Sequence, residues 1–340
     1  MKTTSIRSYL SVSWVLAAAA ALAFTSNLSA QTEENYIGTN LYSGAPNLSS
    51  TGQHGPYKAP LVFTKSSYAT GGVALRNRGA GNISVSGLVG PSTTVFLYWA
   101  VITPTAAVPA AATSVQIQRL FPGVSANVVV PGVAVGRGPA PCWQAGSVIT
   151  VFRAAVNPAI VTGNGSYQLR ILPGGSGRVD GADPWAVPFL TPAWEGASLV
   201  VIGAGTGTVS IFDSGLAGHS FWPPFNYSLN LPSATIAGRT TLFDNIGADG
   251  QHGFARNAFN VGIADETTTI NGWPVAGPGS NYSDSDWNGS SGLPLPELWD
   301  DTGHNITAAT PQGTTALNIR INQVGSAADC LSLVANVVQE

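Results

Sequence analysis

The stretch SLVVIGAGTGTVSIFD, from Ser198 to Asp213, joins an apolar run to a glycine-rich segment and decides between two folds. In a dinucleotide-binding α/β domain, G-x-G-x-x-G follows a strand and opens a helix whose N-terminus faces the pyrophosphate. Gly203 and Gly205 fit the first two glycines, but Thr208 stands at the third. The residues that follow, TVSIF, are rich in β-branched side chains and alternate, which is typical of a strand. The sequence therefore predicts two antiparallel strands joined by a tight GAGTG connection, and no nicotinamide cofactor.

Strand patterns continue along the chain. TTVFLYWAVIT, residues 93–103, is apolar on both alternating faces, as in a strand covered on both sides. TALNIRINQV alternates cleanly, with Leu317, Ile319 and Ile321 on one face and Asn318, Arg320 and Asn322 on the other. The closing CLSLVANVV predicts a last strand. Gly- and Pro-rich turn clusters separate these runs, so we expect an all-β, largely antiparallel β-sandwich of jelly-roll type, with one lobe or two packed lobes.

The N-terminus has the pattern of a secretory signal peptide. Lys2 and Arg7 precede an apolar run over residues 14–24, and small and polar residues follow up to Ala30. An uncleaved N-terminal anchor is the alternative. No later run of about twenty apolar residues predicts a transmembrane segment. We therefore expect residues 1–30 to be a signal peptide, residues 31–340 to form a single compact unit, and the protein to be secreted or held at the cell surface.

Charge and cysteine content give further information on the class of protein and its partners. Only 9% of the residues are charged, the formal net charge is -3, and no basic stripe occurs, which argues against nucleic acid as a partner. Cys142 and Cys330 are the two cysteines of the chain. In an exported protein such a pair predicts a disulfide, with two buried thiols or metal ligation as alternatives.

Several segments resemble a family of exported bacterial and archaeal β-domains of unknown function. The family is marked by a Leu-Tyr-Trp strand, here Leu97, Tyr98 and Trp99, and by a Ser-Leu-Val strand that leads to an aromatic-aspartate turn, here Phe212 and Asp213. The resemblance covers most of residues 70–338 and implies a secreted or surface-associated β-fold. It implies no catalytic residues.

Catalytic motifs are weak. The sequence contains no G-x-S-x-G elbow and no H-E-x-x-H pair. Its histidines are scattered singly, at positions 54, 219, 252 and 304, where loop or turn roles are expected. The segment FDNIGADGQHGFARN gathers Asp244, Asp249, His252 and Arg256, which could perform acid-base chemistry in a secreted hydrolase or could simply form turns and a local ion pair. No catalytic residue is assigned.

Two further loop features suggest ligands. NYSDSDWNGSSG spaces carboxylate and amide oxygens two residues apart, as in calcium loops. A structural calcium ion there would use Asp284, Asp286 and Asn288, completed by Asp300 and Asp301; the alternative is a solvated polar loop. Aromatic side chains in Gly- and Pro-rich loops could hold sugar rings, and these are Trp273, Tyr282 and Trp287. Four other tryptophans lie in or beside strands and are expected in the core: Trp99, Trp143, Trp194 and Trp299.

These features together favour a non-enzymatic extracellular or cell-surface protein that acts in adhesion or assembly through sheet edges and loop aromatics. The expected partners are copies of the same chain, other surface proteins or extracellular glycans. A carbohydrate-binding β-sandwich module and a secreted hydrolase are the alternatives.

Overall fold

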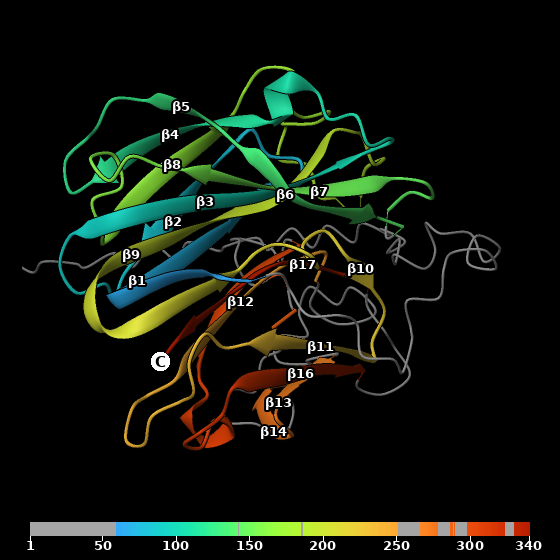
Figure 1. Cartoon of the computed structure of the whole chain (residues 1–340). Coiled ribbons are helices and arrows are strands. Elements are labelled where there is room, and N and C mark those ends of the chain that lie inside the picture. Colours follow the sequence, from blue (N-terminus) through green and yellow to red (C-terminus); the bar gives the residue numbers. More distant parts are fainter. Residues whose placement is uncertain are drawn as a thin grey trace, which may run out of the picture.

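The computed structural model describes residues 59–141, 143–184, 186–250, 266–277, 286–287, 289, 298–323 and 330–340. These residues form three sheets in which every strand pairing is antiparallel, with two short 3-10 helices at Ala110–Ala112 and Thr307–Ala309. The sheets pack face to face in layers (Figure 1). The expectation of an all-β, antiparallel sandwich is confirmed.

The central sheet has nine strands and is organised by the long strand β9, Ala193–Phe212. β1 pairs along one edge of β9. On the other edge, β3 pairs with the first half of β9 and β17 with the second half, so one strand belongs to both ends of the molecule. The other strands of this sheet are β1 Leu61–Ala74, β3 Ser92–Thr103, β6 Val133–Pro139, β7 Val148–Ala155, β10 Ser220–Phe221, β12 Leu242–Ala248, β15 Trp299–Asn305 and β17 Leu331–Gln339.

The continuity of β9 corrects one prediction. The GAGTG segment lies inside the strand and does not connect two antiparallel strands. Its glycines serve a close approach: a Cβ added at Gly205 would lie 2.5 Å from the backbone of Ser66, and one at Gly207 would lie 2.6 Å from the carbonyl oxygen of Glu340. The register of β1 on β9 shifts at Ser66, so this segment is a β-bulge where β9 changes neighbours. β9 continues as a strand after this segment, as the alternating residues TVSIF predict.

A first sandwich forms on one face of the central sheet. A four-stranded outer sheet, in the order β2-β8-β4-β5, covers this face. Leu97, Trp99 and Val101 of β3 point into the core between the two sheets, where Trp99 stacks on Trp194 with ring centroids 5.7 Å apart. The outer strands are β2 Ala80–Val85, β4 Ser114–Phe121, β5 Val128–Pro131 and β8 Gly165–Ile171.

A second sandwich forms at the other end of the central sheet. Its outer sheet, in the order β11-β16-β13-β14, packs against β12 and β17 through a core that contains Phe225, Tyr227 and Phe243. Leu317, Ile319 and Ile321 of β16 point into this core while Asn318 and Arg320 are exposed, as the alternation predicts. The outer strands are β11 Phe225–Asn230, β13 Glu266–Ile270, β14 Trp273–Ala276 and β16 Ala316–Gln323.

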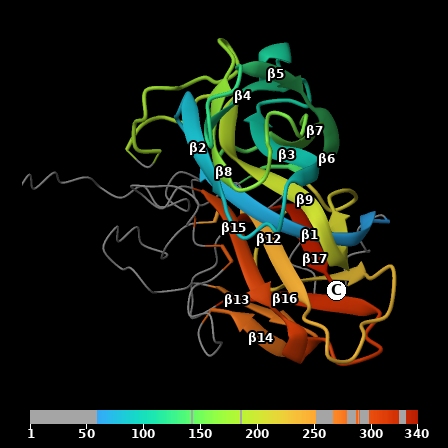
Figure 2. The ribbon, with the colours of Figure 1, turned by 90° about the vertical axis from the view of Figure 1, so that its left-hand side faces the viewer.

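Between the two sandwiches lies a third core. Tyr98, Ala100 and Ile102, on the reverse face of β3, pack there with Ile246 and Trp299. β3 is therefore covered on both sides, as its sequence predicts. Figure 2 shows the same layering from the side, with β4 and β5 at one end and β13 and β14 at the other. The four tryptophans expected in the core are all buried: Trp99, Trp143, Trp194 and Trp299.

The last strand, β17, lies inside the central sheet between β12 and β9, as predicted. Cys330, directly before it, is fully buried in the third core, where Ala140 and Trp143 also lie. Cys142 lies outside the described residues, so its pairing with Cys330 stays a prediction. In the described part of the chain, no helix is long and apolar enough to span a membrane.

Candidate functional site

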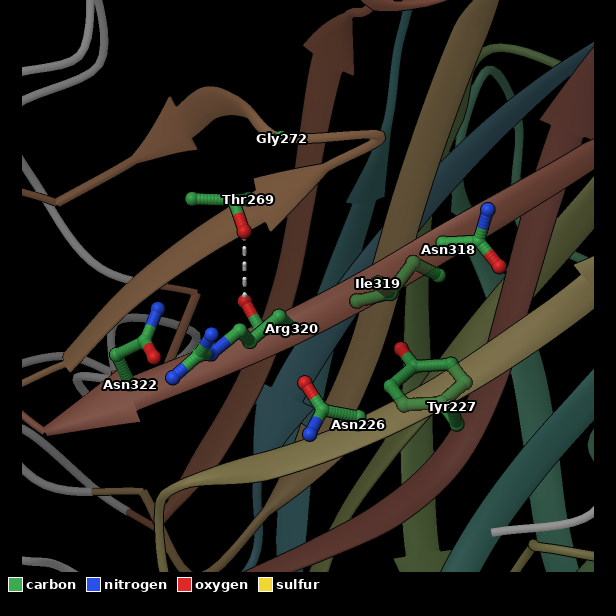
Figure 3. A pocket seen from close by; sticks show the side chains of 8 residues that line it. All are labelled: Asn226, Tyr227, Thr269, Gly272, Asn318, Ile319, Arg320 and Asn322. Carbon is green, nitrogen blue, oxygen red and sulfur yellow. Dashed lines mark hydrogen bonds between the residues drawn. The ribbon is translucent and has the colours of Figure 1, made fainter. Parts of the chain in front are cut away.

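The outer face of the sheet β11-β16-β13-β14 carries a polar groove of about 540 Å³ (Figure 3). This volume is in the range of small-molecule sites. Central strand β16 has β11 on one side and β13 on the other, with Asn226 and Thr269 both opposite Arg320. The groove is lined by Asn226, Tyr227, Thr269, Gly272, Asn318, Ile319, Arg320 and Asn322.

The polar side chains of the groove fall into two groups. Asn318 is held in place, because Ser228 Oγ donates to its Oδ1 at 2.9 Å and its Nδ2 donates to Asn271 Oδ1 at 3.2 Å. The side chains of Asn226, Arg320 and Asn322 make no hydrogen bond to another residue in the described part of the chain. Amide and guanidinium groups in this state can donate to ligand oxygens, and the amides can also accept.

Among the aromatic residues proposed to hold sugar rings, Trp273 is the one that the structure leaves accessible. It follows the Asn271-Gly272 turn that joins β13 to β14, and 51% of its surface is exposed. Trp273 lies directly opposite buried Ile270 in the hairpin, so its side chain is on the inner face of the sheet and does not line the groove, although Gly272 beside it does. Trp287 is only 1% exposed and packs edge-on against Phe221 in the second sandwich, so it cannot stack on a ligand. Tyr282 lies outside the described residues.

A second polar cluster forms where β15 contacts β1 and β9. Asp244 lies opposite Gly303 in the pairing of β12 with β15, so Asp301, two residues before Gly303, lies on the same face as Asp244. A Cβ at position 303 would lie 2.6 Å from Asp244 Oδ1, so the glycine leaves room for that carboxylate. Asp301 is partly exposed.

The two carboxyl groups influence each other's titration. Burial raises the pKa of Asp244 to about 6, although hydrogen bonds from Tyr68 and Thr70 lower it. Burial and the negative charge of Asp244 raise the pKa of Asp301 to about 7, against hydrogen bonds from Ser198 and Thr70. Two neighbouring carboxyl groups with raised pKa values are able to hold and exchange a proton near neutral pH.

Asp249 belongs to a different, buried cluster. Its Oδ1 accepts from Trp143 Nε1 at 2.8 Å and lies 3.5 Å from Arg76 Nη2, and Arg76 also forms an ion pair with Glu195. The hydrolase hypothesis had placed Asp244 and Asp249 in one acid-base site. The structure places them in two separate clusters. His252 and Arg256 lie outside the described residues, as does His54.

Asp286 also has partners that the sequence did not suggest. Its Oδ1 accepts from Thr302 Oγ1 at 2.9 Å and pairs with His304 Nε2. Burial lowers the pKa of His304, but the Asp286 charge more than offsets this and the net pKa is raised. His304 thus lies in strand β15 and pairs with a carboxylate, not in the loop or turn that was expected for it.

The proposed calcium ligands are only partly described. Asp300 and Thr302 alternate with Asp301 along β15, so Asp301 points to the opposite face from Asp286 and Asp300 and does not join a site with them. Asp284 and Asn288 lie outside the described residues. In the part of the chain that the structure describes, no group of three or more His, Cys, Asp or Glu is arranged to hold a metal ion.

The residues that surround Asp244 and Asp301 were not predicted from the sequence. Tyr68, Thr70 and Ser198 lie in strands β1 and β9, which are distant from both aspartates in sequence. One local signal was present: Gly303 interrupts the alternating strand DDTGHN, and a glycine inside a strand often marks a close approach.

Comparison with known proteins gives no family for the chain. No protein-family profile and no curated protein sequence matches it. Among solved structures, N-glycanase F is 11% identical, with 81% of this chain and 96% of that chain covered and a TM-score of 0.23. The ANX2 ectodomain from Arabidopsis thaliana is 7% identical over 84% and 83%, with a TM-score of 0.23. The tandem CBM51 modules from Streptococcus pneumoniae are 10% identical over 78% and 83%, with a TM-score of 0.20. Likeness at this level defines neither activity nor ligand.

Proposed function

We propose that the protein is a secreted or cell-surface interaction protein that binds carbohydrate in the groove on the outer face of the sheet β11-β16-β13-β14. The observation that carries this proposal is the groove itself, lined by amide, hydroxyl and guanidinium side chains on the outer face of the sheet. Saccharides present many hydroxyl groups and apolar ring faces. Amide, hydroxyl and guanidinium side chains held on a sheet can form hydrogen bonds with several of these hydroxyls at once.

Assembly through pairing of sheet edges is the other route by which such a protein could act, and two edge strands argue against it. β5 and β14 are edge strands of four residues each, and they contain Pro131 and Pro274. Short edge strands with proline are a common means of preventing sheets from pairing with other chains. At the β5 and β14 edges, adhesion through a bound glycan therefore fits better than polymerisation through strand pairing.

Affinity electrophoresis in gels that contain soluble polysaccharides tests the proposal. The protein should be retarded by at least one glycan, and Asn226→Ala should weaken binding severalfold, because it removes hydrogen bonds between the groove and the ligand. Asn82→Ala is the matched control, because Asn82 carries an exposed amide but lies on β2, in the outer sheet of the first sandwich. Equal retardation of the two variants would contradict the proposal.

A second candidate function is glycan hydrolysis by Asp244 and Asp301. The two aspartates lie diagonally across the β12–β15 pair on one face, and glycosidases act through a pair of carboxyl groups on either side of the bond that they cleave. Asp301, whose pKa is raised to about 7, would act as the acid and Asp244 as the base. Release of reducing ends from a bound glycan, lost in both Asp244→Asn and Asp301→Asn but kept in Asp180→Asn, would support it. No release from any glycan that the protein binds would exclude it.

A further inference from the structure

We infer that the groove selects anionic saccharides and that Arg320 is the residue that recognises the anion. This inference rests on the glycan-binding function proposed above and names the class of ligand. It starts from the distribution of charge over the sheet that carries the groove.

The four strands of this sheet contain only two charged side chains, Glu266 and Arg320. Glu266 is fully buried and alternates with outward-facing Thr267, so it lies on the inner face with Thr268 and Ile270. Arg320 is exposed on the outer face. The described strands therefore present one positive charge and no negative charge to a ligand in the groove.

No carboxylate in the described part of the chain neutralises Arg320. The ion pairs of Arg76, Arg153 and Arg178 all lie on other sheets or loops. The cross-strand neighbours of Arg320 are neutral, with Asn226 on β11 and Thr269 on β13. In a protein with a net charge of -3 and only 14 Lys and Arg residues, an arginine without such a partner in a groove is a specific attraction for anions.

The geometry of the arginine side chain narrows the ligand class. A guanidinium group presents paired N–H donors that match the two oxygens of a carboxylate, and it also binds sulfate oxygens. The flanking amides of Asn226, Asn318 and Asn322 can bond the neutral hydroxyls of the same sugar. A uronic acid or a sulfated sugar offers both kinds of group on one ring.

Paired polymers with the same backbone test this inference. Binding of the purified protein is measured by affinity electrophoresis for polygalacturonate against its methyl ester, and for dextran sulfate against dextran. The first pair tests a carboxylate and the second a sulfate ester. The variants are Arg320→Gln, Arg320→Lys and Asn226→Ala, with folding checked by thermal unfolding.

The wild-type protein should bind at least one anionic polymer about tenfold or more tightly than its neutral counterpart, because hydrogen bonds to charged groups are stronger than neutral ones. Arg320→Gln should abolish the preference but keep binding to the neutral polymer, and Arg320→Lys should keep only part of it. Wild-type binding without a preference, but weakened in Asn226→Ala, would overturn this inference and leave the proposed function standing. A preference unchanged in Arg320→Gln would overturn the assignment of Arg320, and no binding to any of the four polymers would overturn both proposals.

Discussion

The hydroxyl of Tyr98 donates a hydrogen bond to Asp213 Oδ2 at 2.7 Å. Tyr98 belongs to the Leu-Tyr-Trp strand and Asp213 to the aromatic-aspartate turn, the two motifs on which the resemblance to exported β-domains was based. Asp213 also forms an ion pair with Arg153 of β7. The two motifs are thus one structural unit, which fixes the turn after β9 onto the reverse face of β3 and β7.

This unit should contribute more to the free energy of unfolding than a surface ion pair does. Tyr98→Phe should lower the free energy of unfolding by about 1–2 kcal/mol through the loss of one bond to a charged acceptor. Asp213→Ala should cost about 3 kcal/mol, because it leaves the hydroxyl of Tyr98 and the guanidinium of Arg153 without their acceptor. Urea denaturation measures both values. Asp180→Ala, which breaks the exposed pair with Arg178, is the control and should leave the midpoint nearly unchanged. Equal effects of Asp213→Ala and Asp180→Ala would contradict this interpretation.

Arg76 should contribute more to the free energy of unfolding than the Tyr98–Asp213 unit does, and its contribution should depend on pH. Its guanidinium carbon lies 4.2 Å from the ring centroid of Trp143, and the group pairs with buried Glu195 and Asp249. Burial raises the pKa of both carboxyl groups, and the charge of Arg76 lowers it again. Arg76→Met keeps most of the packing but should cost roughly 3–5 kcal/mol at pH 7, because two buried carboxyl groups lose their counter-charge.

The pH dependence of Arg76→Met follows from these directions. Without the arginine, both carboxyl groups should stay protonated to higher pH in the folded state than in the unfolded state. The folded variant therefore binds more protons, so its stability should fall as the pH rises from 5 to 8 more steeply than that of the wild-type protein. Thermal unfolding across this range measures the difference. Arg76→Met/Glu195→Gln should recover part of the loss at pH 8, and parallel curves for Arg76→Met and the wild-type protein would contradict the role of the charge.

The carboxyl groups of Asp244 and Asp301 should also make the stability of the folded protein depend on pH. Their pKa values of about 6 and about 7 lie above the roughly 3.9 of an aspartate in an unfolded chain. The folded state therefore holds extra protons at low pH, and this stabilisation is lost as the pH rises through about 6 and 7. Asp301→Asn should raise the free energy of unfolding by roughly 1–3 kcal/mol at pH 8, with much less effect at pH 5.

Denaturant titrations at pH 5 and pH 8 measure the effect of Asp301→Asn. Asp180→Asn is a suitable control, because hydrogen bonding to the backbone of Ala182 lowers the pKa of Asp180 and its contribution therefore has the opposite sign. A gain at pH 8 in Asp301→Asn but not in Asp180→Asn would support the carboxyl pair. The same gain at both pH values would mean that packing, and not charge, is the cause.

Local patterns predicted the strands well, because side chains alternate between the two faces of every strand, whatever sheet the strand joins. The strand expected at 93–103 is observed at Ser92–Thr103, and the polar face of β16 is the one that its alternation indicates. The prediction of a tight connection at GAGTG was wrong, because glycine in a strand can mark either a turn or a close approach of another backbone. The deciding contact comes from distant residues: Ser67 Oγ donates to the carbonyl oxygen of Ala204 at 2.9 Å.

The polar sites could be predicted only where they follow a single strand. Asn318, Arg320 and Asn322 alternate on β16, so their shared face was visible in the sequence. The pairing of Asp244 with Asp301 depends on the register of β12 against β15, and each aspartate alone resembles an ordinary turn former. The burial of Trp287 depends likewise on Gly247, where an added Cβ would lie 2.3 Å from the indole ring.

The predicted disulfide joins regions that the structure brings together. Ala140 and Trp143, on either side of Cys142, lie in the same buried cluster as Cys330. A bond between the two cysteines would close a loop through most of the second half of the chain, for which chain-entropy arguments give an upper value of about 5 kcal/mol. Peptide mapping under non-reducing conditions should recover one linked peptide that contains both cysteines, and Cys330→Ala should lower the midpoint of thermal unfolding. Because Cys330→Ala also leaves a small cavity, the comparison that separates the two effects is wild-type protein with and without reductant. A midpoint unchanged by complete reduction would show that burial of Cys330, and not a covalent link, holds the last strand in the sheet.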